Sequence, residues 1–293
     1  MKECLFCNAA YPAEMSECAV CKRSPFCTQG FVSHAPQLAE ESTGFKAGYF
    51  SDLRQLEESN FWFVVRSELI VWAINKHAPR FESFLEIGCG TGYVLSCIHE
   101  NFPTAQLKGS EVFIEGLGFA ASRLPSVELI QMDARRIPYV EEFDVVGAFD
   151  VLEHIKEDVD VIRQAHKSLN PGGLFVVTVP QHAWLWSAAD EYACHERRYG
   201  AKEIEGKIKA VGFEIVQSTS FVTALLPFMV VSRFFQKIKW VKFNPSSELN
   251  INSFINPLFK TLLRFELAII KRGGAYPAGG SRLIVARKMD HAE

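Results

Sequence analysis

A glycine-rich turn in the first third of the chain constrains the fold more than any other feature of the sequence. Residues 85–92 read Leu-Glu-Ile-Gly-Cys-Gly-Thr-Gly, a short apolar run followed by alternating glycines, and a helical pattern begins at Tyr93. Glycine is needed where a turn is tight or where a side chain would keep the backbone from a ligand. The following helix would offer free N–H groups and the positive end of its dipole. The stretch therefore predicts a strand–turn–helix unit that presents its backbone to a ligand.

Short apolar runs alternate with helix-length segments between residues 81 and 220. Such alternation predicts βαβ units, right-handed crossovers and a mostly parallel sheet, which is an α/β fold. Residues 221–280 interrupt the rhythm with apolar, partly basic helical stretches and a glycine-rich loop. The predicted strands are Phe84–Ile87, Gln106–Ser110, Val127–Met132, Phe143–Phe149, Gly173–Val179, Phe213–Ser218 and, after the interruption, Arg282–Ala286.

Acidic residues occupy regular places relative to these strands. Glu86 lies within the first strand, Glu111 ends the second, and Asp133 follows the third. A carboxylate about twenty residues past such a glycine turn can accept hydrogen bonds from both ribose hydroxyls. Two more stretches flank the fourth and fifth strands: Asp-Val-Leu-Glu-His at 150–154 and Asn-Pro-Gly-Gly at 170–173.

This order of motifs across residues 81–180 resembles the class I, Rossmann-like methyltransferases that use S-adenosylmethionine (SAM), and in particular the ubiquinone/menaquinone-type domain. The resemblance implies a seven-stranded sheet with helices on both faces and an antiparallel last strand. It also implies that SAM is the cofactor, with Glu86 and the glycine turn holding its methionine part, Glu111 its ribose and Asp133 its adenine. The residues expected to bind SAM are Arg66, Glu86, Gly88, Cys89, Gly90, Gly92, Glu111, Val112, Asp133, Ala134 and Asp150.

Residues 46–80 are predicted to be helical, because apolar side chains recur there at helical spacing. Residues 61–66 resemble the helix that such enzymes lay over the cofactor. Arg66 is suited to a bidentate pair with the SAM carboxylate; the alternative is a solvated arginine beside packed aromatic residues. We expect a helical region at 46–80 and the methyltransferase domain at 81–293, with 221–280 as an insertion before the last strand.

Histidines gather where the acceptor of the methyl group is expected. SAM is already activated, so the protein mainly aligns the nucleophile, and a base is needed when the acceptor must lose a proton. His154 and His195 follow the fourth and fifth predicted strands and are our candidates for that base. The stretch 195–199 resembles an H-x-R-R-Y segment of methyltransferases from glycan and secondary-metabolite pathways. The residues expected to contact the acceptor are His182, Arg197, Arg198 and Tyr199.

Two alternatives stay open at this rim. Arg197 and Arg198 would otherwise form salt bridges with acidic neighbours at 190 and 191. The stretch 150–154 also resembles the E-x-x-E-H motif with which certain ubiquinone-type and small-RNA methyltransferases hold a divalent cation, although Asp150 stands in place of the first glutamate.

Residues 1–45 are predicted to form a zinc-ribbon-like module. Two C-x-x-C pairs lie ten residues apart, a spacing that suits a tetrahedral, structural zinc site and leaves Cys27 as a spare or replacement ligand. The alternative is reduced, unliganded thiols. Cysteines so clustered indicate a reducing compartment, so we expect a cytoplasmic protein. The expected zinc ligands are Cys4, Cys7, Cys18 and Cys21.

Residues 221–243 are apolar and basic and contain no acidic residue. The segment fits a lid over the acceptor site or a helix at the inner face of an anionic membrane. We expect no leader peptide, because the given sequence does not open on a basic region followed by an apolar run, and no apolar run in it is long enough to span a bilayer. The chain's net charge of −3 gives no strong nucleic-acid signal.

We therefore expect methyl transfer from SAM to an oxygen, with nitrogen or carbon as weaker alternatives, of a small-molecule or lipid-linked glycan acceptor. The competing hypotheses are an RNA or protein methyltransferase recruited through the zinc module, a non-catalytic SAM-binding protein, and a nicotinamide-dependent oxidoreductase.

Overall fold

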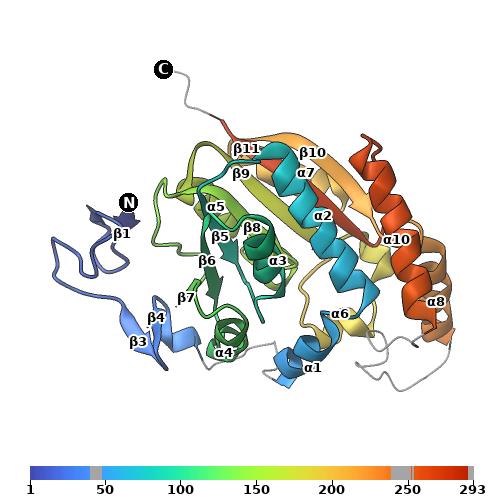
Figure 1. The fold of residues 1–293 in the computed structure, drawn as a ribbon, viewed down its shortest axis with the longest axis horizontal. Helices are drawn as coiled ribbons and strands as arrows, with labels where there is room; N and C mark the ends of the chain where they lie inside the picture. Colours follow the sequence, from blue (N-terminus) through green and yellow to red (C-terminus); the bar gives the residue numbers. More distant parts are fainter. Residues whose placement is uncertain (40–47, 239–251, 253, 290–293) are drawn as a thin grey trace.

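A nine-stranded sheet forms the centre of the protein in a computed structural model that describes residues 1–39, 48–238, 252 and 254–289. The strand order is β10-β11-β9-β8-β5-β6-β7-β4-β3 (Figure 1). Its strands are β3 (Phe26–Thr28), β4 (Phe31–Ser33), β5 (Ser83–Ile87), β6 (Gln106–Glu111), β7 (Glu128–Gln131), β8 (Phe143–Phe149), β9 (Leu169–Pro180), β10 (Phe213–Phe221) and β11 (Ser281–Lys288).

Strands β5 to β11 confirm the predicted seven-stranded sheet. β7, β6, β5, β8 and β9 run parallel to one another, whereas β11 runs antiparallel to both β9 and β10. The stretch 170–173, which flanks the predicted fifth strand, lies inside β9 as an irregularity, because Phe143 pairs with Leu169 while Val145 pairs with Leu174.

Helices cover both faces of the sheet. The strands alternate their side chains between two cores, so that Val145 belongs to one core and Val146 to the other. The first core takes residues from α2, α3, α4 and α10, and the second from α5 and α7. The helices are α1 (Gly48–Leu56), α2 (Phe61–His77), α3 (Tyr93–Asn101), α4 (Ile114–Arg123), α5 (Asp158–Ser168), α6 (Ala188–Tyr192), α7 (Ala201–Ala210), α8 (Leu226–Ile238) and α10 (Ile255–Lys271).

The insertion before the last strand contributes α8 and α10, which confirms its helical nature. α10 packs on α2, where the rings of Phe61 and Phe259 lie 5.3 Å apart. Lys239, Trp240 and Lys242, part of the basic segment singled out in the sequence, lie outside the described residues. No described helix is both long and apolar enough to cross a bilayer.

The N-terminal residues extend the main sheet, which the sequence did not predict. β4 pairs in parallel with β7 and antiparallel with β3, while β1 (Lys2–Glu3) and β2 (Ala10–Tyr11) form a small separate sheet. Strands of two or three residues are too short to show a period, so nothing in the sequence marked them.

One buried glutamine fastens this extension to the carboxyl ends of β6 and β7. The Gln131 side-chain oxygen accepts hydrogen bonds from Ser33 Oγ (2.7 Å) and Ala35 N (3.0 Å). Its nitrogen donates to Ala35 O (2.8 Å) and Val112 O (2.9 Å). All four positions of the amide are therefore used to hold residues 33–35 against the sheet.

Replacing Gln131 with leucine should lower the free energy of unfolding by about 3 kcal/mol, because several buried polar groups would lose their partner at once. Urea unfolding followed by circular dichroism measures the change. The matched control is Gln37→Leu at an exposed position, which should change stability by less than about 0.5 kcal/mol. Equal effects of the two substitutions would contradict the assignment.

Candidate cofactor and acceptor site

The turn between β5 and α3 requires glycine at three positions. Gly88, Gly90 and Gly92 have φ values of 66°, 52° and 75°, a region that side chains disfavour. A Cβ on Gly88 would lie 2.6 Å from a methyl group of Val151, and one on Gly92 would lie 3.0 Å from the Ala120 Cβ. The glycines therefore let the turn approach both α4 and the loop after β8.

Glu86 is a buried carboxylate just ahead of this turn. It is 2% exposed, and its Oε2 atom has no hydrogen-bond partner among the described residues. Burial raises its pKa well above the usual range, and the nearby Glu111 and Glu57 charges add to this while Arg66 opposes it. An unpartnered buried acceptor is costly. A ligand with a cationic or N–H group would offset that cost, and SAM carries both an ammonium and a sulfonium.

Two further acidic groups lie at the carboxyl ends of β6 and β7. Glu111 accepts hydrogen bonds from the backbone N–H groups of Val112 (2.8 Å), Gly90 (3.0 Å) and Phe113 (3.2 Å), and burial raises its pKa. Asp133 forms a bidentate ion pair with Arg135. Cys89 and Ala134 are buried beside these groups.

Arg66 on α2 lies at the junction between the two halves of the site. Its Nε is 2.7 Å from Asp150 Oδ2, and its Nη2 donates to Phe149 O at 3.1 Å. The guanidinium also stacks over Trp62, with 4.7 Å between its carbon and the ring centroid. The arginine is 7% exposed, so it is a buried ion-pair partner rather than a solvated side chain.

α1 lies over the glycine turn. Phe50 is 3% exposed, and its ring is 3.6 Å from the Cβ position of Gly90 and 3.0 Å from that of Gly116. The side chain therefore packs between the turn and α4.

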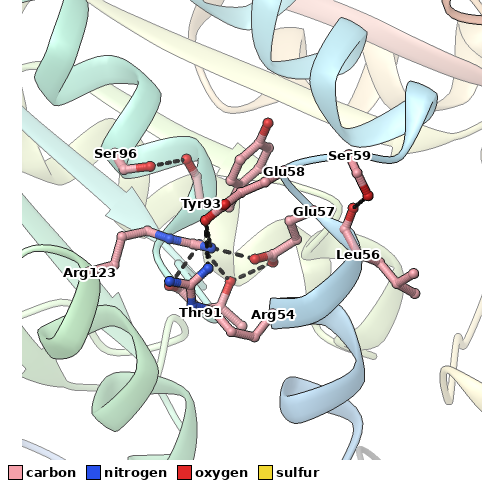
Figure 2. A network of polar contacts seen from close by, with 9 residues as sticks. All are labelled: Arg54, Leu56, Glu57, Glu58, Ser59, Thr91, Tyr93, Ser96 and Arg123. Carbon is pink, nitrogen blue, oxygen red and sulfur yellow. Dashed lines mark hydrogen bonds and ion pairs between the residues drawn. The ribbon is translucent and has the colours of Figure 1, made fainter. Parts of the chain in front are cut away.

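A polar network anchors the residues after α1 to the turn (Figure 2). Glu57 accepts a hydrogen bond from Thr91 Oγ1 and forms a 3.0 Å ion pair with Arg123 on α4. Arg123 also donates to Thr91 O at 3.1 Å and stacks over Tyr93. The sequence did not predict these contacts, since charges so far apart in the chain carry no local pattern.

The loops after β8, β9 and β10 carry backbone strain at their first or second residue. Asp150, His182 and Val222 have φ values of 56°, 66° and 61°. These three strands are mutually parallel, so the strained residues share the carboxyl edge of the sheet, where ligands bind in open α/β folds. Non-glycine residues with positive φ gather at functional sites.

The structure brings the two candidate bases together. The His154 and His195 rings lie 4.7 Å apart, and ligand atoms of both lie within 4.8 Å of each other and of Glu153. Burial and the neighbouring His195 lower the pKa of His154 to about 3, so it is neutral at ordinary pH. His195 Nδ1 lies 2.9 Å from Asp190 Oδ1, which orients the ring. The pair His195–Asp190 can accept a proton through Nε2.

Glu153 in this cluster is fully buried, and its two carboxylate oxygens find no hydrogen-bond partner on another described residue. Glu153, His154 and His195 thus fit a divalent cation in number and type of donor. Asp150, expected as a ligand from the sequence motif, pairs with Arg66 instead.

The arginines expected to bind the acceptor are engaged within the protein. Arg197 lies 2.9 Å from Asp158 and Arg198 2.7 Å from Asp190. Both arginines thus form salt bridges, which was the alternative to acceptor binding. Arg198 pairs with the expected Asp190, whereas Arg197 pairs with Asp158 and not with Glu191.

Of the other two residues expected to contact the acceptor, Tyr199 is buried, whereas His182 lies at the rim. Tyr199 is completely buried, and its single hydroxyl proton is donated to Asp158 Oδ2 (2.7 Å), with Leu152 O also 3.1 Å from the hydroxyl oxygen. Its expected contact with the acceptor is therefore corrected to a packing role. His182 stacks on Trp184, which is 53% exposed at the same rim.

The N-terminal thiols form a second cluster. Cys4 Sγ and Cys21 Sγ lie 3.6 Å apart, Cys7 Sγ and Cys18 Sγ 3.7 Å apart, and all four sulfurs lie within 4.8 Å of one another. Tetrahedral zinc with Zn–S bonds of about 2.3 Å needs sulfurs about 3.8 Å apart. The four thiols fit that metal, whereas Cys27 lies apart on β3.

Glu57→Gln should destabilise the protein by about 3 kcal/mol, because it leaves Arg123 as an uncompensated charge in a pair whose side chains are 6% and 7% exposed. Thermal unfolding measures the loss. Glu58→Gln is the matched control: its carboxylate is 65% exposed, pairs with the exposed Arg54 and lies 3.5 Å from Arg123, so the loss should stay below about 1 kcal/mol. A similar loss in both variants would show that Glu57 does not anchor α1.

Comparison with known proteins agrees with this geometry. A family model described as a methyltransferase domain matches residues 65–218. A probable SAM-dependent methyltransferase of Mycolicibacterium smegmatis is 26% identical over 163 residues, covering 55% of this chain and 62% of that protein. A counterpart from Mycobacterium tuberculosis is 27% identical over 166 residues, covering 54% and 57%. The chain thus spans about three fifths of the length of these curated relatives.

Solved structures share the fold at lower identity. Phosphoethanolamine N-methyltransferase 2 of Haemonchus contortus superposes with a TM-score of 0.51 at 18% identity, covering 76% of this chain and 53% of that one. The cyclase SpnF superposes with a TM-score of 0.51 at 20% identity, covering 75% and 80%. With the family model matching more than half of its length and its sheet showing the same plan, the chain belongs to the family of class I SAM-dependent methyltransferase domains.

Proposed function

We propose that the protein transfers a methyl group from SAM to an oxygen of a small-molecule or lipid-linked glycan acceptor, with nitrogen or carbon as weaker alternatives. The observation that carries the choice of oxygen is the His195–Asp190 pair beside His154, at the carboxyl edge of the sheet. A hydroxyl acceptor must lose a proton during methyl transfer, and an imidazole oriented by a carboxylate can take it.

Each half of the site has a distinct task in this proposal. SAM supplies a methyl group on a positively charged sulfur. Glu86 and the glycine turn bind its methionine part, and Glu111 its ribose. His195 accepts the proton of the acceptor hydroxyl at Nε2, while Asp190 holds Nδ1 and stabilises the charged ring. The exposed Trp184 offers an apolar face on which an acceptor can rest.

Within the family, we place the chain near the ubiquinone/menaquinone-type domain because of the motif at 150–154. The same resemblance implies a divalent cation, which Glu153, His154 and His195 would hold. Such a cation would bind an acceptor oxygen and lower the pKa of its hydroxyl. Buried Glu153, with no partner on another described residue, supports this variant of the proposal.

A second candidate is methylation of RNA recruited by the N-terminal module. A cavity of about 240 Å³ lies between this module and the methyltransferase sheet. Its lining includes Phe6, Phe26, Arg23, Arg136 and Asp133. Arg23 stacks over Phe6, with 5.1 Å from its carbon to the ring centroid. Aromatic rings beside arginine are the groups on which unpaired bases stack.

The first experiment adds methyl-labelled SAM and purified protein to extract of the source cells and then separates organic, aqueous small-molecule and RNA fractions. We expect label in the organic or the small-molecule fraction. His195→Asn should reduce labelling by about 10²–10⁴-fold with SAM affinity unchanged, because it removes only the base. Label in RNA would instead establish the second candidate.

Glu86→Gln tests the cofactor half by calorimetric titration with SAM. Removing the buried charge should weaken SAM binding by at least about tenfold. Glu82→Gln, an exposed carboxylate just before β5, is the matched control and should bind as the parent does. If the parent protein bound no SAM, it would not be a SAM-dependent enzyme.

We further propose that Cys4, Cys7, Cys18 and Cys21 bind one structural zinc ion, because four thiolates leave no open coordination position. Thiolates of this kind persist in a reducing compartment, so we place the protein in the cytoplasm.

Metal analysis of protein produced in zinc-supplemented medium should find one zinc per chain. Cys7→Ser should lose the metal and lower the melting temperature, whereas Cys27→Ser, the matched control on β3, should keep it. Retention of zinc by Cys7→Ser, or its loss from Cys27→Ser, would overturn the ligand set.

A further inference from the structure

α10 is apolar on two opposite faces. One face carries Leu263, Leu267 and Ile270, which are at most 4% exposed and belong to the core. The other carries Phe254 just before the helix, then Leu258 and Phe265, which are 86%, 58% and 69% exposed. A helix on the surface of a soluble protein normally turns polar residues outward. The outward face of α10 therefore requires an explanation beyond the fold.

α8 continues the same surface. Phe228 and Val231 are 61% and 54% exposed, and the Phe228 ring lies 6.1 Å from that of Phe259 on α10. Figure 1 shows the two helices side by side at one end of the molecule, far from the N-terminal module. We call the following residues the insertion patch: Phe228, Val230, Val231, Phe254, Ile255, Leu258, Phe265 and Ile269.

Exposed apolar residues are concentrated in the insertion patch and are not spread evenly over the surface. It holds eight of the fifteen large apolar residues that are exposed in the described part of the chain. Scattered exposed apolar side chains are normal, whereas contiguous patches mark sites of association.

The sequence segment that carries the patch is opposite in net charge to the rest of the chain. Residues 221–272 contain eight basic and two acidic residues, a net charge of +6, so the remainder of a chain with net charge −3 carries −9. One of the two acidic residues, Glu266, is buried and accepts hydrogen bonds from Thr223 N and Ala224 N. Lys271 and Arg272 are exposed at the end of α10.

We propose that the insertion patch docks the protein onto an anionic membrane surface. Apolar side chains that enter the headgroup region and cations that meet anionic lipids together give interfacial binding without a spanning helix. A second copy of the chain is the poorer occupant, because a symmetric contact would bring the exposed cations Lys271 and Arg272 of two copies together.

Docking also bears on the acceptor. α8 contacts the short helix at 183–185, which carries Trp184 at the acceptor rim. A membrane under the insertion patch would thus lie beside that rim. This consequence rests on the proposed function and favours a lipid-linked acceptor, whereas docking itself does not depend on catalysis.

The test is flotation of the full-length protein with vesicles of phosphatidylcholine alone or mixed with phosphatidylglycerol, without SAM or acceptor. We expect binding to the mixed vesicles that weakens with salt. Phe254→Ser with Phe265→Ser should lower the partition coefficient at least about tenfold on mixed vesicles. Lys271→Gln with Arg272→Gln should lower it by about fivefold per charge.

Val20→Ser with Val32→Ser is the matched control, since both valines are exposed (68% and 44%) on the N-terminal module; this variant should bind as the parent does. All substitutions lie at exposed sites, and unchanged melting temperatures would show that folding is intact. Absence of binding to mixed vesicles by the parent protein would overturn the proposal. So would a dimer in sedimentation velocity that Phe254→Ser with Phe265→Ser dissociates while vesicle binding is unaffected.

Because flotation needs neither cofactor nor turnover, an inactive protein that still floats would refute the proposed function and leave membrane docking intact. An active protein that does not float would refute membrane docking and leave the proposed function intact.

Discussion

The lack of a side chain at Gly88 allows the turn after β5 to pack against the loop after β8, and the rest of the site depends on this contact. A Cβ there would come within 2.6 Å of Val151, so only glycine allows the turn after β5 to pack against the loop after β8. The first loop presents the cofactor-binding backbone, and the second leads to Glu153 and His154. Arg66 reinforces the junction from α2 by pairing with Asp150. The proposed cofactor and acceptor halves are therefore joined at one edge of the sheet, as alignment of a methyl donor with its acceptor requires.

Two segments that lie outside the seven predicted strands close the expected cofactor side of this edge. Gln131 fastens residues 33–35 beside Val112, where the adenine end of the cofactor is expected. Glu57 and Arg123 anchor α1 over the glycine turn, with Phe50 against Gly90. Each closure uses a buried polar group with several partners, so the N-terminal residues are coupled to the site rather than only appended to it.

The parts of the fold that were predictable are those with a local pattern. The glycine turn, the seven strands and the helices of the insertion follow from spacing and periodicity alone. The placement of Glu111 and Asp133 at strand ends followed from the resemblance to the family. β3 and β4 were not predictable, because three residues show no period. The same holds for the Glu57–Arg123 pair, whose members are distant in sequence.

The acceptor rim shows where side-chain predictions fail. Residues 195–199 were expected to face the acceptor as a group, yet their side chains divide between roles. His195 joins His154, whereas Tyr199 turns inward to Asp158. A dense run of ionisable residues indicates a functional loop, but burial of each member depends on contacts with α5 and the loop after β8. Those contacts are set by tertiary packing, so sequence spacing could not assign them.

The separation of basic and acidic residues along the chain would also orient the protein at an anionic membrane. The sequence outside residues 221–272 has a net charge of −9 and is repelled by an anionic membrane, whereas residues 221–272, with a net charge of +6, are attracted. Electrostatics alone would therefore turn the insertion patch toward the membrane before any apolar contact forms. The same α10 whose inner face completes the core against α2 carries this outer face, so its orientation relative to the sheet is fixed by packing. An acceptor approaching along the membrane would then meet the carboxyl edge of the sheet in one orientation, which is the condition for selecting one hydroxyl among several.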